Sequence, residues 1–200
     1  MGFAINRRHF TLTALMGATA AAMATNPKRM LVVGDSISAE YGLPRGTGWV
    51  ALMQKKLQEL GLPWSVINAS ISGDTTASGR SRLGALLKTH QPHVVVIELG
   101  GNDALRGLSL AMTGDNLQVM IDAARQSGAK VLLVGMQVPP NYGLDYSRQF
   151  ARVYAQLAQK NKIRWLPFFF KGIAEGTDTA DWFQSDRIHP NETAQPKLLA

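Results

Sequence analysis

The chain contains no cysteine, and this absence excludes several kinds of chemistry at once. Without a thiol the protein has no disulfide bond, no thiolate nucleophile and no thiolate ligand for a metal ion. Its 21 lysines and arginines exceed its 14 acids, but they are scattered along the chain and are not clustered with aromatic residues. This distribution is typical of a solvated surface and argues against nucleic-acid binding. The net charge of +7 suggests at most a weak attraction to anionic substrates or lipid headgroups.

The chain also lacks an apolar run long enough to cross a membrane, which needs about 20 apolar residues. The nearest candidate, residues 10–22, is uncharged but contains three threonines. It follows Arg7 and Arg8 and ends beside Ala22-Met23-Ala24, whose small residues suit a cleavage site. We therefore expect residues 1–24 to be an export signal that is removed, which leaves no stable membrane anchor and a net charge of +5. The arginine pair resembles a twin-arginine motif, and the general secretory route is the alternative.

Residues 25–200 read as one globular domain, because 46% of the chain is hydrophobic and no linker or repeat interrupts it. Short apolar blocks alternate with amphipathic helical stretches. Continuous apolar blocks are typical of a parallel sheet that is covered on both faces. The predicted strands are 30–33, 64–69, 94–99, 131–136 and 163–168, and the predicted helices are 49–60, 76–87, 116–127 and 145–161. Gly128 suits a helix C-terminal cap. The pattern predicts an α/β protein, a three-layer α/β/α sandwich with a five-stranded parallel sheet.

Polar residues follow the predicted strands where each strand ends. Ser36, Gly73 and Asn102 lie just beyond the first three strands, and the loop 137–144 follows the fourth. In an open parallel sheet, ligands bind beyond the carboxyl ends of the strands. We therefore expect these segments to converge on one pocket although they are far apart in the sequence.

Ser36 is the candidate nucleophile. Gly34 permits a tight turn after the first strand, which would expose the Ser36 hydroxyl and direct its own amide at a developing negative charge. The alternative is that Asp35 or Ser36 merely caps a helix in an ordinary turn.

Gly73 and Asn102 are the candidate donors of an oxyanion hole. A glycine lets a backbone N–H approach a substrate closely, and the Asn102 side-chain amide can donate a hydrogen bond where an aspartate could not. The alternatives are a loop glycine and an Asx turn that ends a buried strand.

Asp186 and His189 are three residues apart near the C-terminus. This spacing can place a carboxylate beside the imidazole Nδ1, which leaves Nε2 free to take a proton from Ser36. Pro190 keeps His189 out of helical geometry, and we expect it to begin the terminal helix. Asp181 is the alternative carboxylate, eight residues from the histidine.

Other polar residues favour structural roles. Glu98 lies inside an apolar strand and Asp103 follows Asn102, so we expect these acids to need buried partners and to support the loops. His90 and His93 resemble a metal-binding pair, but Pro92 breaks the helix that this spacing requires. We expect no metal site.

Together these segments resemble the conserved blocks of the SGNH (GDSL-type) hydrolases, and the likeness spans about residues 29–196. The blocks are Gly34-Asp35-Ser36, residues 68–74, Gly100 to Gly107, Pro140 to Gly143 and Asp186 to Asn191, and the last three are similar to the bacterial thioesterase I, arylesterase and lysophospholipase subgroup. One departure is Ala104, where relatives often have glycine.

The resemblance implies a flavodoxin-like fold, a periplasmic location and a serine esterase without a cofactor. By this likeness Ser36 is the nucleophile, His189 the base and Asp186 its orienting acid, and the Ser36 N–H, the Gly73 N–H and the Asn102 amide form the oxyanion hole. Members of the subgroup hydrolyse fatty acyl thioesters, aryl esters and lysophospholipids, so a small-molecule acyl ester or thioester is the expected partner. The candidate acyl-chain contacts are Leu105, Leu108, Pro139 and Tyr142.

Three other functions fit parts of the pattern. A carbohydrate or small-acyl deacetylase would share the fold and the catalytic residues. A flavodoxin-like module could bind FMN or phosphate, although no phosphate-cradling glycine run is present. An inactive relative could keep the fold as an interaction surface. The sequence is silent on oligomeric state.

Overall fold

The computed structural model describes residues 26–138, 140–175 and 180–200. The export signal expected at residues 1–24 and the predicted acyl contact Pro139 therefore lie outside the described residues. Across the described ranges, none of the helices combines the length and the hydropathy needed to span a membrane.

Five parallel strands form one sheet in the order β2-β1-β3-β4-β5. Each predicted strand is confirmed within a few residues. The last is shorter than expected because the regular ladder ends at Leu166: the Phe169 N–H, and not the Phe168 N–H, donates to the Gly135 carbonyl at 2.9 Å, so the segment carries one extra residue there. The observed strands are β1 (Lys28–Gly34), β2 (Trp64–Asn68), β3 (Val94–Glu98), β4 (Lys130–Val134) and β5 (Arg164–Leu166). This order confirms the predicted parallel α/β sheet of flavodoxin-like type.

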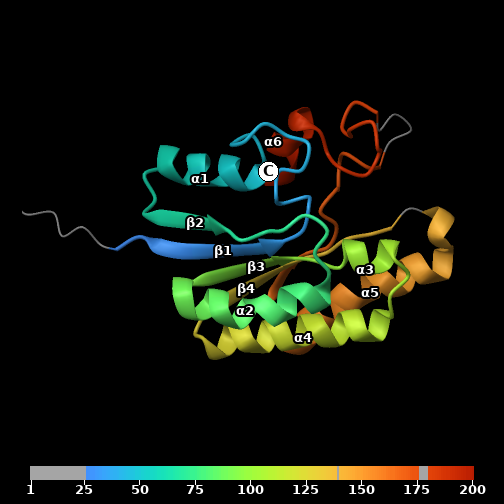
Figure 1. Ribbon diagram of the computed structural model, residues 1–200, viewed down its shortest axis with the longest axis horizontal. Coiled ribbons are helices and arrows are strands. Elements are labelled where there is room, and N and C mark those ends of the chain that lie inside the picture. The colour runs from blue at the N-terminus through green and yellow to red at the C-terminus, as the bar shows by residue number, and fades with distance from the viewer. Residues whose placement is uncertain (1–25, 139, 176–179) are drawn as a thin grey trace, which may run out of the picture.

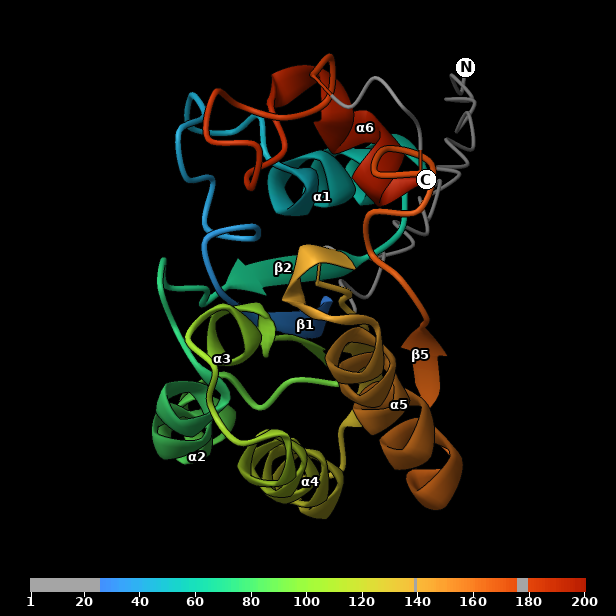
Figure 2. The ribbon, with the colours of Figure 1, turned by 90° about the vertical axis from the view of Figure 1, so that its right-hand side faces the viewer.

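Helices cover both faces of the sheet, which gives the predicted three layers (Figures 1 and 2). One face carries α1 (Trp49–Glu59) and the short C-terminal α6 (Gln195–Leu199), which are joined where the Trp49 N–H donates to Gln195 Oε1 at 3.0 Å. The other face carries α2 (Thr76–His90), α4 (Leu110–Gln126) and α5 (Leu144–Asn161). Helix α1, which follows β1, and helix α2, which follows β2, lie on opposite faces of the sheet. Because the strands are parallel, the loops beyond β1, β2 and β3 all lie at the carboxyl edge of the sheet.

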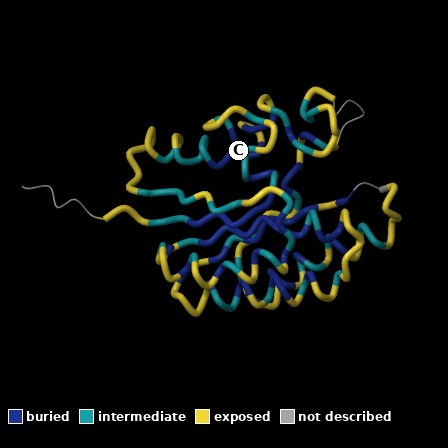
Figure 3. Tube along the Cα trace, in the orientation of Figure 1, coloured by how far each residue is buried: buried dark blue, intermediate teal, exposed yellow. Residues whose placement is uncertain are grey.

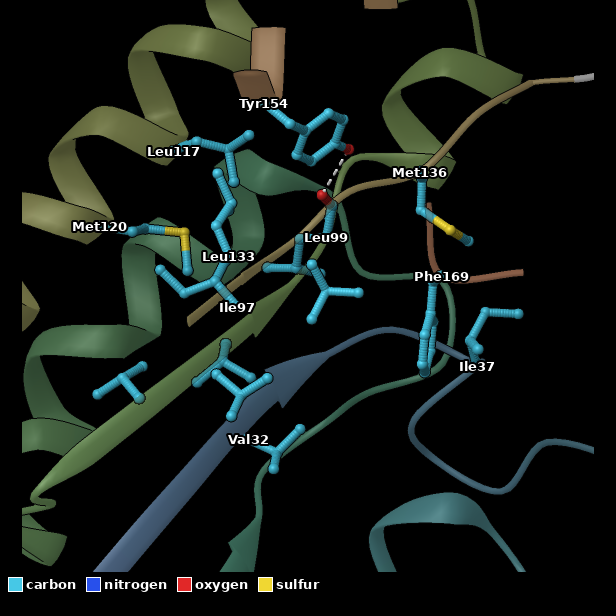
Figure 4. Close-up of a cluster of buried hydrophobic side chains, with 14 of the residues drawn as sticks. Val32, Ile37, Ile97, Leu99, Leu117, Met120, Leu133, Met136, Tyr154 and Phe169 are labelled. Atoms are coloured by element: carbon cyan, nitrogen blue, oxygen red, sulfur yellow. Dashed lines mark hydrogen bonds between the residues drawn. The ribbon is translucent and has the colours of Figure 1, made fainter. Parts of the chain in front are cut away.

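The core lies on both sides of the central strands, which form the buried centre of the chain in Figure 3. Leu31, Val32 and Val33 are consecutive and fully buried, as a two-sided sheet requires. On the face that carries α4 and α5, the Tyr154 hydroxyl donates to the Leu99 carbonyl at 2.9 Å (Figure 4). This bond ties α5 to the end of β3, just before the short helix that carries Asn102.

The helices differ from expectation at α3 and at the start of α4. A short helix, α3 (Gly101–Leu105), was not predicted because it has five residues and begins after Gly100, whose φ is +119°. Helix α4 begins at Leu110 and not at residue 116, since the Ser109 side chain accepts a hydrogen bond from the Met112 N–H and caps it. The predicted C-terminal cap Gly128 is confirmed, with φ of +85°.

The prediction that Pro190 begins the terminal helix is wrong. Pro190 pairs with Phe183 in an antiparallel bridge, and the Asn191 side chain caps a 3₁₀ turn, Glu192–Ala194. Helix α6 follows this turn and has Pro196 in its first turn.

Candidate active site

Ser36 and His189 meet at the carboxyl edge of the sheet although 153 residues separate them. The Ser36 Oγ lies 2.8 Å from the His189 Nε2, within hydrogen-bond range. Ser36 comes directly after β1 and Asp35, whereas His189 comes from the segment that leads into α6. The side chain of His189 is 17% exposed, so the pair is accessible without being fully solvated.

Asp186 is the carboxylate partner of His189, and the alternative Asp181 is not. The Asp186 Oδ2 lies 2.7 Å from His189 Nδ1, and its Oδ1 accepts the backbone N–H groups of Ile188 and His189 at 2.9 and 3.0 Å. Arg187 takes the left-handed conformation, with φ of +57°, so that the chain can turn back on the carboxylate. Burial alone would raise the pKa of Asp186, but the two backbone N–H groups and the imidazole outweigh it and lower the pKa. Asp186 is therefore a stable anion that can hold one tautomer of the imidazole.

The loop after β1 presents Ser36 at a single tight turn, and α1 begins only at Trp49. The Ala39 N–H donates to the Asp35 carbonyl at 3.0 Å, and the Ile37 N–H donates to Asp35 Oδ1 at 3.0 Å. Asp35 therefore forms an Asx turn and caps no helix, contrary to the alternative that Asp35 or Ser36 is a helix cap, and the Ser36 side chain beside it is half-buried. Gly34 is required by packing, because a Cβ there would lie 2.7 Å from Glu98 Oε2.

The backbone amides of Ser36 and Gly73 have no hydrogen-bond acceptor among the described residues. Gly73 has φ of +82°, a conformation that favours glycine. The loop is held by Arg106, whose Nη2 donates to the Gly73 carbonyl at 3.0 Å. These two amides can donate to an anion that forms on a substrate.

The Asn102 side chain lies between the loop that carries Asp35 and Ser36 and the loop that carries Gly73 and Asp74. Its Nδ2 donates to Asp35 Oδ2 at 3.1 Å and to the Asp74 carbonyl at 3.0 Å. Its amide nitrogen, and not its oxygen, therefore faces these two loops. An oxyanion at this place would accept one of these N–H groups together with its present acceptor, Asp35 Oδ2 or the Asp74 carbonyl.

The buried acids Glu98 and Asp103 support the segments around the site through hydrogen bonds, as expected. Glu98 is fully buried, and its Oε2 accepts from the Ser38 hydroxyl at 2.7 Å and from the Asp35 N–H at 3.4 Å. Burial, together with the nearby Asp35 carboxylate, raises the pKa of Glu98 well above its ordinary value. Asp103 accepts from the Thr76 N–H at 2.9 Å and so joins α3 to the start of α2.

Two neighbours of His189 carried no signal in the sequence. The Tyr41 ring lies against the imidazole, with centroids 4.4 Å apart. Gln184 donates from Nε2 to the Tyr41 carbonyl at 2.8 Å, and its backbone N–H donates to the His189 carbonyl at 2.8 Å. Gly42 leaves room for Gln184, since a Cβ there would lie 2.1 Å from Gln184 Oε1. These contacts join the histidine loop to the loop after Ser36.

Three of the four expected acyl-chain contacts lie beyond the carboxyl ends of β3 and β4, at the same edge of the sheet, and Pro139 is outside the described residues. Leu105 ends α3, Leu108 follows it, and Tyr142 lies in the 3₁₀ turn Pro140–Tyr142 before α5; all three side chains are exposed. The Tyr146 hydroxyl donates to the Ala104 carbonyl at 3.3 Å and connects α5 to α3.

The histidine pair that resembled a metal site has a structural role at the opposite edge. His93 Nδ1 accepts the Arg29 N–H at 3.1 Å, and the Arg29 side chain donates to the His90 carbonyl at 2.6 Å. No three histidine, aspartate or glutamate side chains gather in a metal-binding arrangement among residues 26–138, 140–175 and 180–200.

The chain is similar to known hydrolases over most of its length. The model of the GDSL-like lipase/acylhydrolase family matches residues 32–195. Esterase TesA of Pseudomonas aeruginosa is 52% identical over 170 residues, which is 85% of this chain and 83% of that protein. Thioesterase 1/protease 1/lysophospholipase L1 of Escherichia coli is 42% identical over 167 residues, 84% of this chain and 77% of that protein. A crystal structure of TesA superposes with a TM-score of 0.82, at 52% identity, over 86% of this chain and 94% of that one.

Proposed function

This chain belongs to the GDSL-like lipase/acylhydrolase family and is an ester-cleaving hydrolase, and from that premise we propose that Ser36, His189 and Asp186 are its catalytic triad. One observation carries the proposal. An unbroken line of contacts runs from Ser36 Oγ to His189 Nε2 at 2.8 Å and from His189 Nδ1 to Asp186 Oδ2 at 2.7 Å. This is the arrangement that an imidazole needs to take a proton from a serine hydroxyl.

In the proposed reaction, His189 Nε2 takes the Ser36 proton while Ser36 Oγ attacks the acyl carbonyl carbon. The protonated imidazole, held by Asp186, then gives that proton to the leaving alcohol or thiol as the acyl–enzyme forms. Water repeats the sequence, since His189 deprotonates it for attack on the acyl–enzyme, which releases the acid and restores the serine.

Three donors stabilise the oxyanion in this proposal: the Ser36 N–H, the Gly73 N–H and the Asn102 amide. The two backbone amides have no acceptor in the described ranges of the chain, which supports the assignment. Removal of one such donor typically lowers turnover by about 10² to 10³. We expect Asn102→Ala to remain folded with a loss of that size.

The proposed substrates are carboxylic esters and acyl thioesters, including aryl esters, fatty acyl thioesters and lysophospholipids. The names of the relatives, esterase and thioesterase/lysophospholipase, support this range. Leu105, Leu108, Pro139 and Tyr142 would contact the acyl chain. The mechanism requires no cofactor.

Kinetics with 4-nitrophenyl esters of increasing acyl length test the proposal. We expect Ser36→Ala and His189→Ala each to lower kcat by about 10⁴ or more while the fold is kept. Activity of Ser36→Ala within a few-fold of the parent would contradict it. In the parent enzyme, a maximum at acetyl with a collapse beyond butyryl would favour the deacetylase instead.

We also propose that residues 1–24 direct residues 25–200, as one domain, to the periplasm. The test is the N-terminus of the protein recovered from that compartment, which should begin near residue 25. Replacing Arg7 and Arg8 by lysine should block export by the twin-arginine route and leave the general secretory route working. A full-length N-terminus in the cytoplasmic fraction would contradict the proposal.

A further inference from the structure

The mechanism leaves a buried aspartate unused beside the nucleophile. Asp35 precedes Ser36, is 2% exposed, and accepts one N–H of the Asn102 amide through Oδ2. The second N–H of the same amide goes to the carbonyl of Asp74, which follows Gly73. The Asn102 amide therefore contacts the neighbours of both other oxyanion donors.

These two acceptors determine which end of the amide faces the loops. An asparagine side chain has a donor end and an acceptor end of nearly the same shape. If the amide turned over, its oxygen would lie about 3 Å from the Asp35 carboxylate and from the Asp74 carbonyl, with no hydrogen between any of them. Asp35 therefore favours the orientation in which a nitrogen can donate to an oxyanion.

The Asp35 side chain is itself held in place. Its Oδ1 accepts the Ile37 N–H at 3.0 Å, and its backbone N–H donates to Glu98 Oε2 at 3.4 Å. Glu98 is fully buried, and its Oε1 has no hydrogen-bond partner among the described residues. Burial and the neighbouring Asp35 carboxylate raise the pKa of Glu98 well above its ordinary value, which favours the neutral form of Glu98 beside Asp35. Burial also raises the pKa of Asp35 to about 6, so above that pH the Asp35 side chain is a carboxylate that can only accept hydrogen bonds.

We propose that Asp35 is a positioning residue for the oxyanion hole. Asp35 fixes the Asn102 amide with its nitrogen toward the loop that carries Ser36. Asp35 acts through Asn102 and does not touch the reacting atoms. This inference rests on the proposed function, because it assigns Asn102 the role of a donor.

A double-mutant cycle on kcat tests the proposal. Asp35→Asn introduces a side chain that can donate as well as accept, so the Asn102 amide loses its orientation, and kcat should fall at least tenfold with little change in KM. If Asp35 works through Asn102, the double variant Asp35→Asn/Asn102→Ala should be no slower than Asn102→Ala, within about twofold. A double variant slower by the full product of the two single effects would overturn the proposal.

Asp103→Asn is the matched control. Asp103 is equally buried, at 2% exposure, and lies next to Asn102, but it contacts Thr76 and Thr113. Its effect on kcat should multiply with that of Asn102→Ala. Failure of the proposed function would give a different result, because Ser36→Ala would then keep the activity of the parent enzyme.

A second measurement does not need an Asp35 variant to fold. In the His189→Gln protein, the side-chain ¹⁵N–¹H signals of Asn102, assigned by their loss in Asn102→Ala, should shift as Asp35 titrates in mildly acidic solution. His189, Asp74 and Glu98 are the other titratable groups that face Asp35; His189 is removed here, Asp74 is paired with Arg82 at 2.6 Å, and Glu98 is buried. Signals that stay constant between pH 4.5 and pH 8 would overturn the proposal.

Discussion

The ring of Tyr41 packs against the imidazole of His189, with centroids 4.4 Å apart and planes tilted by 39°. Tyr41 is itself half-exposed and is held through its carbonyl by Gln184. The contact limits how far the imidazole can turn away from Ser36. Asp186 contacts Nδ1 of the same ring, so two independent contacts orient the imidazole.

Tyr41→Ala should therefore loosen the base without removing it. We expect kcat for a soluble aryl ester to fall about tenfold, since small errors in the position of a catalytic group are costly. Tyr41→Phe is the matched control and should keep the parental rate, because the ring and not the hydroxyl makes the contact. Equal losses in both variants would contradict this explanation.

Asp186→Asn should lower kcat by about 10⁴, because an amide at this position can present the wrong tautomer of His189 to Ser36. The pKa of Asp186 is lowered, so its contribution to stability is present above its ordinary pKa of 3.8 and is lost only as the pH falls through the lower folded value. In the parent, Asp186 is therefore ionised at every neutral pH. We expect the loss of rate in Asp186→Asn to be the same throughout the neutral range. Asp181→Asn is the control, and we expect it to match the parent; the reverse result would make Asp181 the partner.

Arg106→Gln should weaken the oxyanion hole indirectly. The variant loses the hydrogen bond to the Gly73 carbonyl, so the Gly73 N–H is less well placed. Arg106 is exposed, and we expect kcat to fall about threefold to tenfold with an unchanged melting temperature. Arg148→Gln, at another exposed arginine, serves as the control for the loss of charge. A full rate in Arg106→Gln would show that the Gly73 loop holds its conformation alone.

Glu98→Gln should change how stability depends on pH. Since burial raises the folded pKa of Glu98 well above 4.5, its contribution is fully present below pH 4.5 and is lost as the pH rises through the folded value. Glutamine resembles the neutral carboxyl and does not ionise. Urea unfolding between pH 4.5 and pH 8 should show the variant gaining stability relative to the parent as the pH rises. A constant difference would mean that Glu98 does not titrate in this range.

Much of the sheet was predictable because its strands are continuous apolar blocks, such as Leu31 to Val33, which both helical layers cover. Helix α4 begins earlier than predicted because Thr113 and Gly114, in its first two turns, are poor helix formers and weaken the helical pattern there. Helix α3 depends on the left-handed Gly100, which the sequence does not distinguish from other glycines.

The site was predictable where its geometry is local or follows from the sheet. Asp186 and His189 are three residues apart, so their contact could be inferred from spacing alone, and Ser36 follows a strand whose carboxyl end faces the same edge. The contacts of Tyr41 with His189 and of Asp35 with Asn102 depend on how segments that are far apart in the sequence pack against each other. No periodicity or motif in the sequence encodes such packing.

The most direct test of the central claim is covalent labelling of the folded enzyme with a fluorophosphonate, followed by mass analysis of its peptides. We expect one adduct, on Ser36, and we expect His189→Ala to suppress it because the hydroxyl is then no longer activated. Labelling of another serine, or none in a folded and active sample, would contradict it.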